Sequence, residues 1–342
     1  MLPVLDDREP VTLSEGATPL VKCDRLAEWA GLRELRVKVE GANPTGSFKD
    51  RGMTVGVTLA RALGATTLAC ASTGNTSASL AAYGARAGLA PLVLVPKGKI
   101  AMGKMAQALA FGARVVEIDG DFDDGMRLVE DLSATGAVYL LNSLNPLRLE
   151  GQKTLMFEIL EEHAPDRVIY PVGNGGNVSA GHKAIKEANA TGLSHAAPIL
   201  SGVQAEGAAP LARAWREKRA YAPVPHAETL ATAIRIGAPV NAAKAMRAIR
   251  DTGGAMAIVS DAEILDAQRM MAAKEGIFVE PASAAPLAGL RKLVAAGIVS
   301  RGESVVLVAT GNGLKDPDVV SRFAKPAVRV PATIDALRAL LR

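Results

Sequence analysis

The feature that most constrains the fold of this chain is a regular alternation of short apolar strands with helices. Apolar runs at 66–71, 91–96 and 114–118 are each followed by a turn and a segment with helical spacing. A second series of the same kind starts near 167 and ends with a strand at 304–310. Such alternation favours parallel sheets with helices on both faces. The sequence therefore predicts an α/β fold with two open parallel-sheet domains.

The length of 342 residues is sufficient for two domains with separate cores. The two series of strands meet near the polar loop at 142–146. We therefore expect a smaller domain at 41–145 and a larger domain that combines 1–40 with 146–342.

Composition and charge argue against several classes of protein. The formal charge is only +4 and no dense block of Lys and Arg is present, so we expect no nucleic-acid partner. No apolar run is long enough for a membrane helix, and the N-terminus lacks the layout of a signal peptide. Cys23 and Cys70 match no metal-ligand spacing, so we expect no metal and two reduced, buried thiols, as in a cytoplasmic protein.

One loop places a lysine at an unusual position. Asn43 and Gly46 interrupt regular structure, and Ser47 is a suitable N-cap for the helix that follows. Lys49 then falls in the first turn, where the partial positive charge of the helix N-terminus favours the neutral amine. A neutral lysine amine can form a Schiff base with a carbonyl compound. The alternative is a surface lysine paired with Asp50 in solvent.

A glycine-rich loop follows the strand at 167–172 and precedes a helix. Backbone N–H groups and the helix dipole at such a junction bind anions, and glycines let the backbone approach the anion closely. The loop matches neither the dinucleotide fingerprint nor a Walker loop. We expect it to bind a phosphate, and the alternative is a structural turn. Its residues are Gly173, Asn174, Gly175, Gly176 and Asn177.

A second polar turn lies between the strand at 66–71 and the next helix. It supplies three hydroxyls and an amide which, with free backbone N–H groups, suit a carboxylate. A helix-capping box would have a similar sequence. The residues are Ser72, Thr73, Asn75 and Thr76.

Thr310 comes directly after the strand at 305–309. Ligands of open parallel sheets bind beyond the carboxyl ends of the strands. A hydroxyl there can hydrogen-bond a ring nitrogen without fixing a positive charge on it. The alternative is a glycine-rich turn in which Thr310 only ends the strand.

Arg148 follows Asn142 and Ser143 and stands at the start of a helix. Its guanidinium can bind a phosphate through two parallel hydrogen bonds, with polar groups nearby. An isolated surface arginine is the alternative.

Together these segments supply a Schiff-base lysine, a phosphate site, a carboxylate site and a partner for a ring nitrogen. Pyridoxal 5′-phosphate has an aldehyde, a phosphate and a pyridine nitrogen, and its substrates are amino acids. The residues therefore indicate this cofactor.

The stretch Asn-Pro-Thr-Gly-Ser-Phe-Lys-Asp-Arg-Gly at 43–52 resembles the cofactor-lysine motif of the tryptophan-synthase-β-like family of pyridoxal-phosphate enzymes, also called fold type II. Threonine and serine dehydratases share this motif. Four further stretches resemble the threonine synthases of the family, and the second and fourth are much more specific than the lysine motif. They lie at 71–76, 142–153, 228–237 and 310–316.

The resemblance implies a role for each cofactor residue. Lys49 would hold the cofactor covalently and later move protons. Asn75 would bind the ring hydroxyl, and Thr310 would face the pyridine nitrogen. The loop at 173–177 would bind the cofactor phosphate. Many relatives have His where this chain has Asn312, so the role of that position stays open.

The resemblance also implies a reaction: O-phospho-L-homoserine and water give L-threonine and phosphate by γ-elimination and β-addition of water, the last step of threonine biosynthesis. The runner-up is a threonine or serine dehydratase, which needs no second phosphate site. A non-catalytic amino-acid-binding protein on the same fold is a third reading, although it has little use for a poised amine. The resemblance suggests a homodimer. The substrate residues would be Ser72, Thr73 and Thr76 at the carboxylate, and Asn142, Ser143 and Arg148 at the phosphate.

Overall fold

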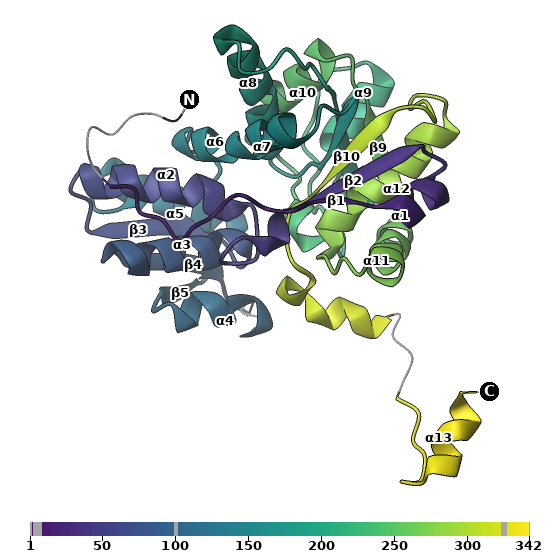
Figure 1. Ribbon diagram of the computed structural model, residues 1–342. Helices are drawn as coiled ribbons and strands as arrows, with labels where there is room; N and C mark the ends of the chain where they lie inside the picture. The colour runs from purple at the N-terminus through teal and green to yellow at the C-terminus, as the bar shows by residue number, and fades with distance from the viewer. Residues whose placement is uncertain (1, 3–8, 99–101, 323–326, 342) are drawn as a thin grey trace.

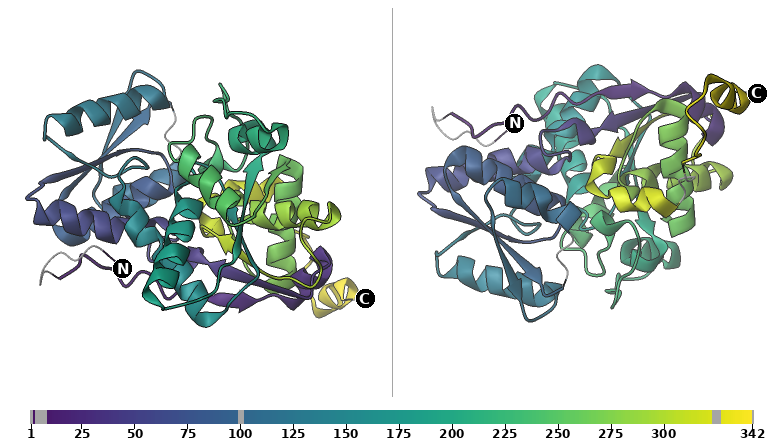
Figure 2. Two further views of the ribbon diagram at one scale, coloured as in Figure 1. Left: turned by 90° about the horizontal axis from the view of Figure 1, so that it is seen from above. Right: turned by 90° about the horizontal axis from the view of Figure 1, so that it is seen from below.

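The computed structural model of the chain describes residues 2, 9–98, 102–322 and 327–341. Two sheets lie side by side, and each is covered by helices (Figure 1). Views from above and below show the same arrangement, with the C-terminal helix apart from both sheets (Figure 2).

The larger sheet joins the beginning of the chain to its second half. Its strands are β1 (Leu20–Lys22), β2 (Glu34–Val39), β7 (Arg167–Pro171), β8 (Ile199–Ala205), β9 (Met256–Val259) and β10 (Ser304–Ala309). They lie in the order β1-β2-β10-β7-β8-β9. All neighbouring pairs are parallel except the edge pair β1 and β2, which is antiparallel. The parallel sheet predicted from the alternation is thus confirmed apart from that edge.

The smaller sheet is parallel throughout and has the order β5-β4-β3-β6. Its strands are β3 (Thr67–Ala71), β4 (Ala90–Pro96), β5 (Arg114–Ile118) and β6 (Tyr139–Leu140).

Helices cover both faces of each sheet, as predicted. Those that alternate with the smaller sheet's strands are α2 (Lys49–Ala62), α3 (Asn75–Ala87), α4 (Met102–Ala110) and α5 (Phe122–Ala134). The others are α1 (Asp24–Ala30), α6 (Leu147–Gln152), α7 (Thr154–Glu162), α8 (Gly176–Thr191), α9 (Pro210–Glu217), α10 (Ala242–Asp251), α11 (Asp261–Glu275), α12 (Pro281–Ala295) and α13 (Ile334–Leu340). Short 3₁₀ turns are η1 (Glu40–Ala42), η2 (Glu206–Ala208), η3 (Thr232–Ile234), η4 (Gly313–Lys315) and η5 (Pro317–Arg322). None of the helices that the structure describes is long and apolar enough to cross a membrane.

The period of two along a strand explains why both faces are covered. On β7, Ile169 packs into the core that also contains residues of α11 and α12. Its neighbours Val168 and Tyr170 pack into the core formed with α7, α8 and α10. Successive side chains of a strand point to opposite faces, so a strand that is apolar at every position needs helices on both sides.

Glycines let α6 pack directly on α2. A Cβ atom at Gly151 of α6 would lie only 1.6 Å from the carbonyl oxygen of Arg51 on α2. A Cβ at Gly52 would lie 2.8 Å from the carbonyl oxygen of Arg148. The two backbones are therefore in contact, and this contact brings α6 beside the first turn of α2.

Candidate active site

The loop that carries Lys49 is joined to the turn after β10. The Phe48 N–H donates to the carbonyl oxygen of Thr310 at 3.0 Å, and the Asn312 N–H donates to the carbonyl oxygen of Gly46 at 2.9 Å. These backbone bonds bring the lysine loop and the threonine turn, which are distant in sequence, to one place.

Ser47 is not the N-cap of α2, contrary to the prediction. The helix is capped at Phe48 without a side-chain hydrogen bond. Ser47 instead pairs with Gly311 in an isolated β-bridge. Its buried hydroxyl has no hydrogen-bond partner among the described residues. Pairing with a distant turn has displaced the local capping preference of serine.

Lys49 is the first residue of α2, so its predicted place in the first helical turn is confirmed. Burial and then the positive charge of Arg148 lower the pKa of Lys49 to about 7, against an opposing effect of the Glu280 carboxylate. Its Nζ lies 4.5 Å from the centroid of the Phe48 ring. The amine is therefore poised near neutrality, and burial is the main cause.

Asp50 is engaged elsewhere and is not a solvated partner of Lys49. Its buried carboxylate accepts hydrogen bonds from the Thr45 N–H at 2.7 Å and the Thr45 hydroxyl at 2.6 Å. It also accepts one from the Ser79 hydroxyl of α3 at 2.6 Å. Asp50 therefore fixes the lysine loop against α3.

The glycine-rich loop leads from β7 into α8, whose first N–H groups have no partner within the helix. Gly175 has a φ of 78°, and a Cβ there would lie 2.8 Å from the Cβ of Ala245. Both features require glycine. The side chain of Asn177 is buried, and neither its nitrogen nor its oxygen meets a hydrogen-bond partner in the part of the chain that the structure describes. A helix N-terminus with an unpaired buried amide suits a bound anion.

Arg148 on α6 is only 2% exposed, and its Nε and Nη2 atoms find no hydrogen-bond partner among the residues described. Burial lowers its pKa to about 10. A buried guanidinium with unpaired donors is costly unless an anion binds it. It is also close enough to Lys49 to lower the pKa of that amine. A second anion site therefore lies beside the lysine.

Asn241 links the two predicted phosphate segments. Its N–H donates to the carbonyl oxygen of Asn174 at 2.9 Å, and its Nδ2 donates to the carbonyl oxygen of Ser143 at 3.3 Å. Sequence reasoning missed Asn241, because it belongs to no local motif.

The other predicted substrate residues are engaged locally or half-buried. The Ser72 hydroxyl accepts from the Gly74 N–H at 3.2 Å. The Asn142 amide contacts the sulfur of Met126 through its nitrogen and accepts from the Leu144 N–H through its oxygen. Thr73, Thr76 and Ser143 are half-buried.

Ser283 and Glu280, which sequence reasoning also missed, surround Thr310. The Ser283 hydroxyl lies 2.9 Å from the Thr310 hydroxyl and accepts from the Gly311 N–H at 2.8 Å. Glu280 contacts the amide of Asn75. A glutamate directly before the N1 proline of α12 is the signal that could have found them.

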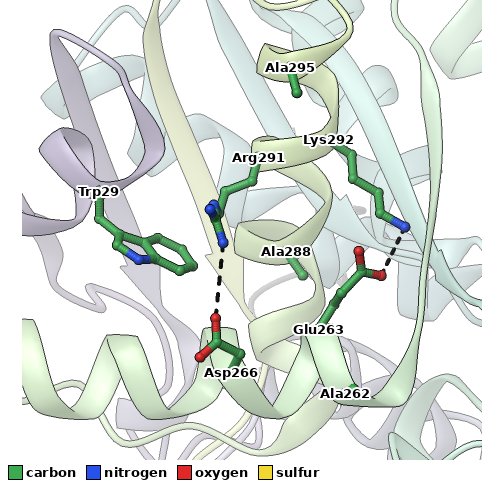
Figure 3. Close-up of a pocket in the computed structure, with 8 residues that line it drawn as sticks. All are labelled: Trp29, Ala262, Glu263, Asp266, Ala288, Arg291, Lys292 and Ala295. Atoms are coloured by element: carbon green, nitrogen blue, oxygen red, sulfur yellow. Dashed lines mark ion pairs between the residues drawn. The ribbon is translucent and has the colours of Figure 1, made fainter.

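A surface groove of about 450 Å³ between α11 and α12 is not part of this site (Figure 3). Its charges pair among themselves, Arg291 with Asp266 and Lys292 with Glu263. The guanidinium of Arg291 also stacks 4.2 Å from the ring centroid of Trp29. The groove lies along the C-terminal half of α12, whereas the contacts to Thr310 come from its N-terminus.

The residues present fit pyridoxal phosphate. The poised amine of Lys49 suits an aldehyde, and the α8 N-terminus with the unpaired amide of Asn177 suits a phosphate. The hydroxyl of Thr310 is buried at the end of a parallel strand, where ring ligands bind.

Comparison with known proteins agrees with this fit. A family model described as "Pyridoxal-phosphate dependent enzyme" matches residues 11–311. A threonine synthase of Methanosarcina acetivorans is 55% identical over 342 residues, covering 99% of this chain and 84% of the relative. Threonine synthases of Methanocaldococcus jannaschii and Mycobacterium leprae are 52% and 51% identical, covering 100% and 98% of this chain and 85% and 91% of the relatives.

Solved structures have the same fold. A bacterial threonine deaminase, from T.th., matches with a TM-score of 0.73 and 26% identity, over 86% of this chain and 92% of that chain. Maize serine racemase matches with a TM-score of 0.76 and 21% identity, over 89% and 91%, which concerns the fold alone. The predicted fold type II architecture and its cofactor are confirmed, and the dehydratase alternative is not favoured. The chain belongs to the family of pyridoxal-phosphate-dependent enzymes, and within it to the threonine synthases.

Proposed function

We propose that this chain converts O-phospho-L-homoserine and water to L-threonine and phosphate at the site built around Lys49. The observation that carries the proposal is Arg148, a buried cation with two unpaired donors beside the lysine. It provides an anion site in addition to the glycine-rich loop. A phosphorylated substrate needs such a site, whereas free threonine or serine does not.

Lys49, Asn75, Thr310 and the loop at 173–177 would hold the cofactor. When bound, pyridoxal phosphate supplies an aldehyde that joins the substrate amine and a ring that accepts the electron pair left at the α-carbon. Thr310 would face the ring nitrogen with a neutral hydroxyl that is itself held by Ser283.

Lys49 is suited to move protons because its pKa is near 7. Its Nζ would accept the proton from Cα and later return one to the same carbon. Between these steps a β-proton is lost, and the Cγ–O bond breaks so that phosphate leaves with the bridging oxygen. Water then adds its oxygen to Cβ, and Cγ gains a proton, which gives the methyl group of threonine.

Arg148 would bind the substrate phosphate, with Asn142 and Ser143 at its side. The loop of Ser143 is already attached to the glycine-rich loop through Asn241. The two phosphate sites would therefore be fixed relative to one another. Ser72, Thr73 and Thr76 would hold the substrate carboxylate at the N-terminus of α3.

We further propose a two-domain organisation, with one domain at 41–145 and the other formed by 1–40 and 146–342. The strands of the smaller sheet all come from within 67–140, which supports this division. A homodimer in the cytoplasm, with no nucleic-acid or membrane partner, rests on the family resemblance and composition. Light scattering of the purified chain tests the dimer, and a monomeric mass would contradict it.

A paired assay tests the function. Protein loaded with pyridoxal phosphate is given O-phospho-L-homoserine in one arm and L-threonine in the other. We expect equal amounts of phosphate and threonine in the first arm and little 2-oxobutanoate in the second. Deamination without phosphate release would contradict the proposal and return Arg148 to a structural role.

A further inference from the structure

Glu280 forms a buried contact between the two sheets at the active site. It is the N-cap residue of α12, on the larger sheet, and is only 5% exposed. Both of its carboxylate oxygens lie 3.0 Å from one atom, the Nδ2 of Asn75. Asn75 is the first residue of α3, on the smaller sheet. The contact therefore fixes a side chain of one sheet from the other.

A carboxylate is a directional partner for an amide because it only accepts hydrogen bonds. The nitrogen of Asn75 must face Glu280, and the amide oxygen must face away. The Nδ2 group has two hydrogens, and a contact shared by both carboxylate oxygens uses one of them. The second hydrogen remains available to another acceptor. Without the carboxylate, the two orientations of the Asn75 amide would differ little in free energy.

Gly311 is required for the carboxylate to reach this position. A Cβ on Gly311 would lie 2.6 Å from Oε1 of Glu280. The backbone N–H of Glu280 also donates to the carbonyl oxygen of Gly311 at 3.1 Å. The turn that carries Thr310 thus holds Glu280, and Glu280 holds Asn75.

We propose that Glu280 is a positioning residue of this active site, which accepts one hydrogen of Asn75 Nδ2 and so keeps the other available to the ring hydroxyl oxygen of pyridoxal phosphate. The inference rests on the proposed function in one respect, the expected role of Asn75 toward that oxygen. It assigns to Glu280 no contact with the substrate.

Three variants separate orientation from packing. Glu280→Gln keeps the shape of the side chain but lets the Asn75 amide adopt either orientation. Asn75→Asp with Glu280→Gln restores the contact in reverse, because the glutamine nitrogen then donates to the aspartate, yet it leaves no donor at position 75. Asn75→Ala removes the amide. Glu263→Gln, in the capping box of α11, is the matched control outside the site.

The affinity for pyridoxal phosphate and the visible absorption maximum are measured at pH 8 with the full chain, after the cofactor has been removed and added back. The melting temperature of the cofactor-free protein is followed in parallel. We expect Glu280→Gln to weaken cofactor affinity several-fold and to shift the absorption maximum. The double variant should weaken affinity about tenfold or more, as expected for a lost charge-assisted bond, while melting like the wild type. The control should match the wild type in all three measurements.

Unchanged affinity and absorption in both Glu280 variants, with weakened binding by Asn75→Ala, would overturn the inference and leave the proposed function intact. A lowered melting temperature in Glu280→Gln without any spectral change would also overturn it, because Glu280 would then be only structural. Unchanged binding by Asn75→Ala would instead remove the role of Asn75 from the proposed function, and this inference with it.

Discussion

At the scale of single residues, two buried cations define the chemistry. Lys49 and Arg148 lie close enough for the charge of the arginine to lower the pKa of the lysine amine. Neither cation could be recognised as buried from its own sequence neighbours. Their pairing explains both a poised base and an anion site.

The pKa of Lys49 predicts how fast the protein captures its cofactor. The neutral amine is the nucleophile, so the rate should rise with pH up to about 7 and level off above it. An ordinary lysine would keep gaining about tenfold per pH unit up to about pH 10. The rate of appearance of the visible band after mixing cofactor-free protein with pyridoxal phosphate measures this. Lys49→Ala should give no band, and a rate that still climbs about tenfold per unit between about pH 8 and 10 would contradict the prediction.

Replacement of Arg148 should separate function from stability. Arg148→Met removes an unpaired buried charge, so the substrate-free, cofactor-loaded protein should gain about 1–3 kcal/mol in its free energy of unfolding. The KM for O-phospho-L-homoserine should rise about 100-fold, because a charge-assisted bidentate contact is lost. Urea unfolding and steady-state kinetics measure the two effects. A variant that is less stable and keeps its KM would show that Arg148 has a structural anion partner only.

At the scale of elements, contacts between helices place these residues. Arg148 belongs to α6, and α6 is held on α2 by direct backbone packing at Gly151 and Gly52. The position of the arginine relative to Lys49 therefore depends on residues that have no side chain.

Gly151→Ala should disrupt this packing. The new Cβ would lie 1.6 Å from the carbonyl oxygen of Arg51, so α6 must move away from α2. We expect a loss of at least about 2 kcal/mol in the free energy of unfolding by urea, and a raised KM for the phosphorylated substrate. Gly302→Ala is the control, because the nearest atom to its new Cβ is 3.8 Å away. Equal stability of the two variants would contradict the account of α6.

Local rules predicted elements and loops better than contacts between them. The start of α2 at Lys49 and the strand-loop-helix around Gly175 follow from turn residues and apolar spacing, which act within a few positions. Ser47 failed as a cap because it pairs with Gly311. Asn241 and Glu280 were missed because their partners are far away in sequence, and no local pattern encodes such contacts.

At the scale of the whole molecule, one buried network of charges joins both sheets. Arg51 of α2 is 1% exposed, and its guanidinium donates to Glu40 beside β2 at 2.6 and 2.9 Å. It also donates to Glu158 of α7 at 2.6 and 2.7 Å. Lys38 of β2 lies 2.9 Å from Glu158 as well. The helix that begins with Lys49 is thus anchored to the larger sheet.

This network predicts a loss of stability in acid. Burial alone would raise the pKa of Glu158, but Arg51 and then Lys38 lower it to about 2, below its ordinary value of 4.5. The stabilisation is therefore complete above pH 4.5 and disappears as the pH falls towards 2. Glu158→Gln should be less stable by about 2–4 kcal/mol at pH 7, with a weaker pH dependence in acid. Urea unfolding from acid to neutral pH measures both, and parallel curves for the two proteins would contradict the prediction.

The central claim is that this chain moves oxygen from water to Cβ while phosphate leaves from Cγ. The most direct test is turnover of O-phospho-L-homoserine in water labelled with ¹⁸O, followed by mass spectrometry of both products. The account predicts one labelled oxygen in threonine and none in the released phosphate, because the bridging oxygen leaves with the phosphorus. Label in the phosphate together with homoserine, or 2-oxobutanoate in place of threonine, would contradict it.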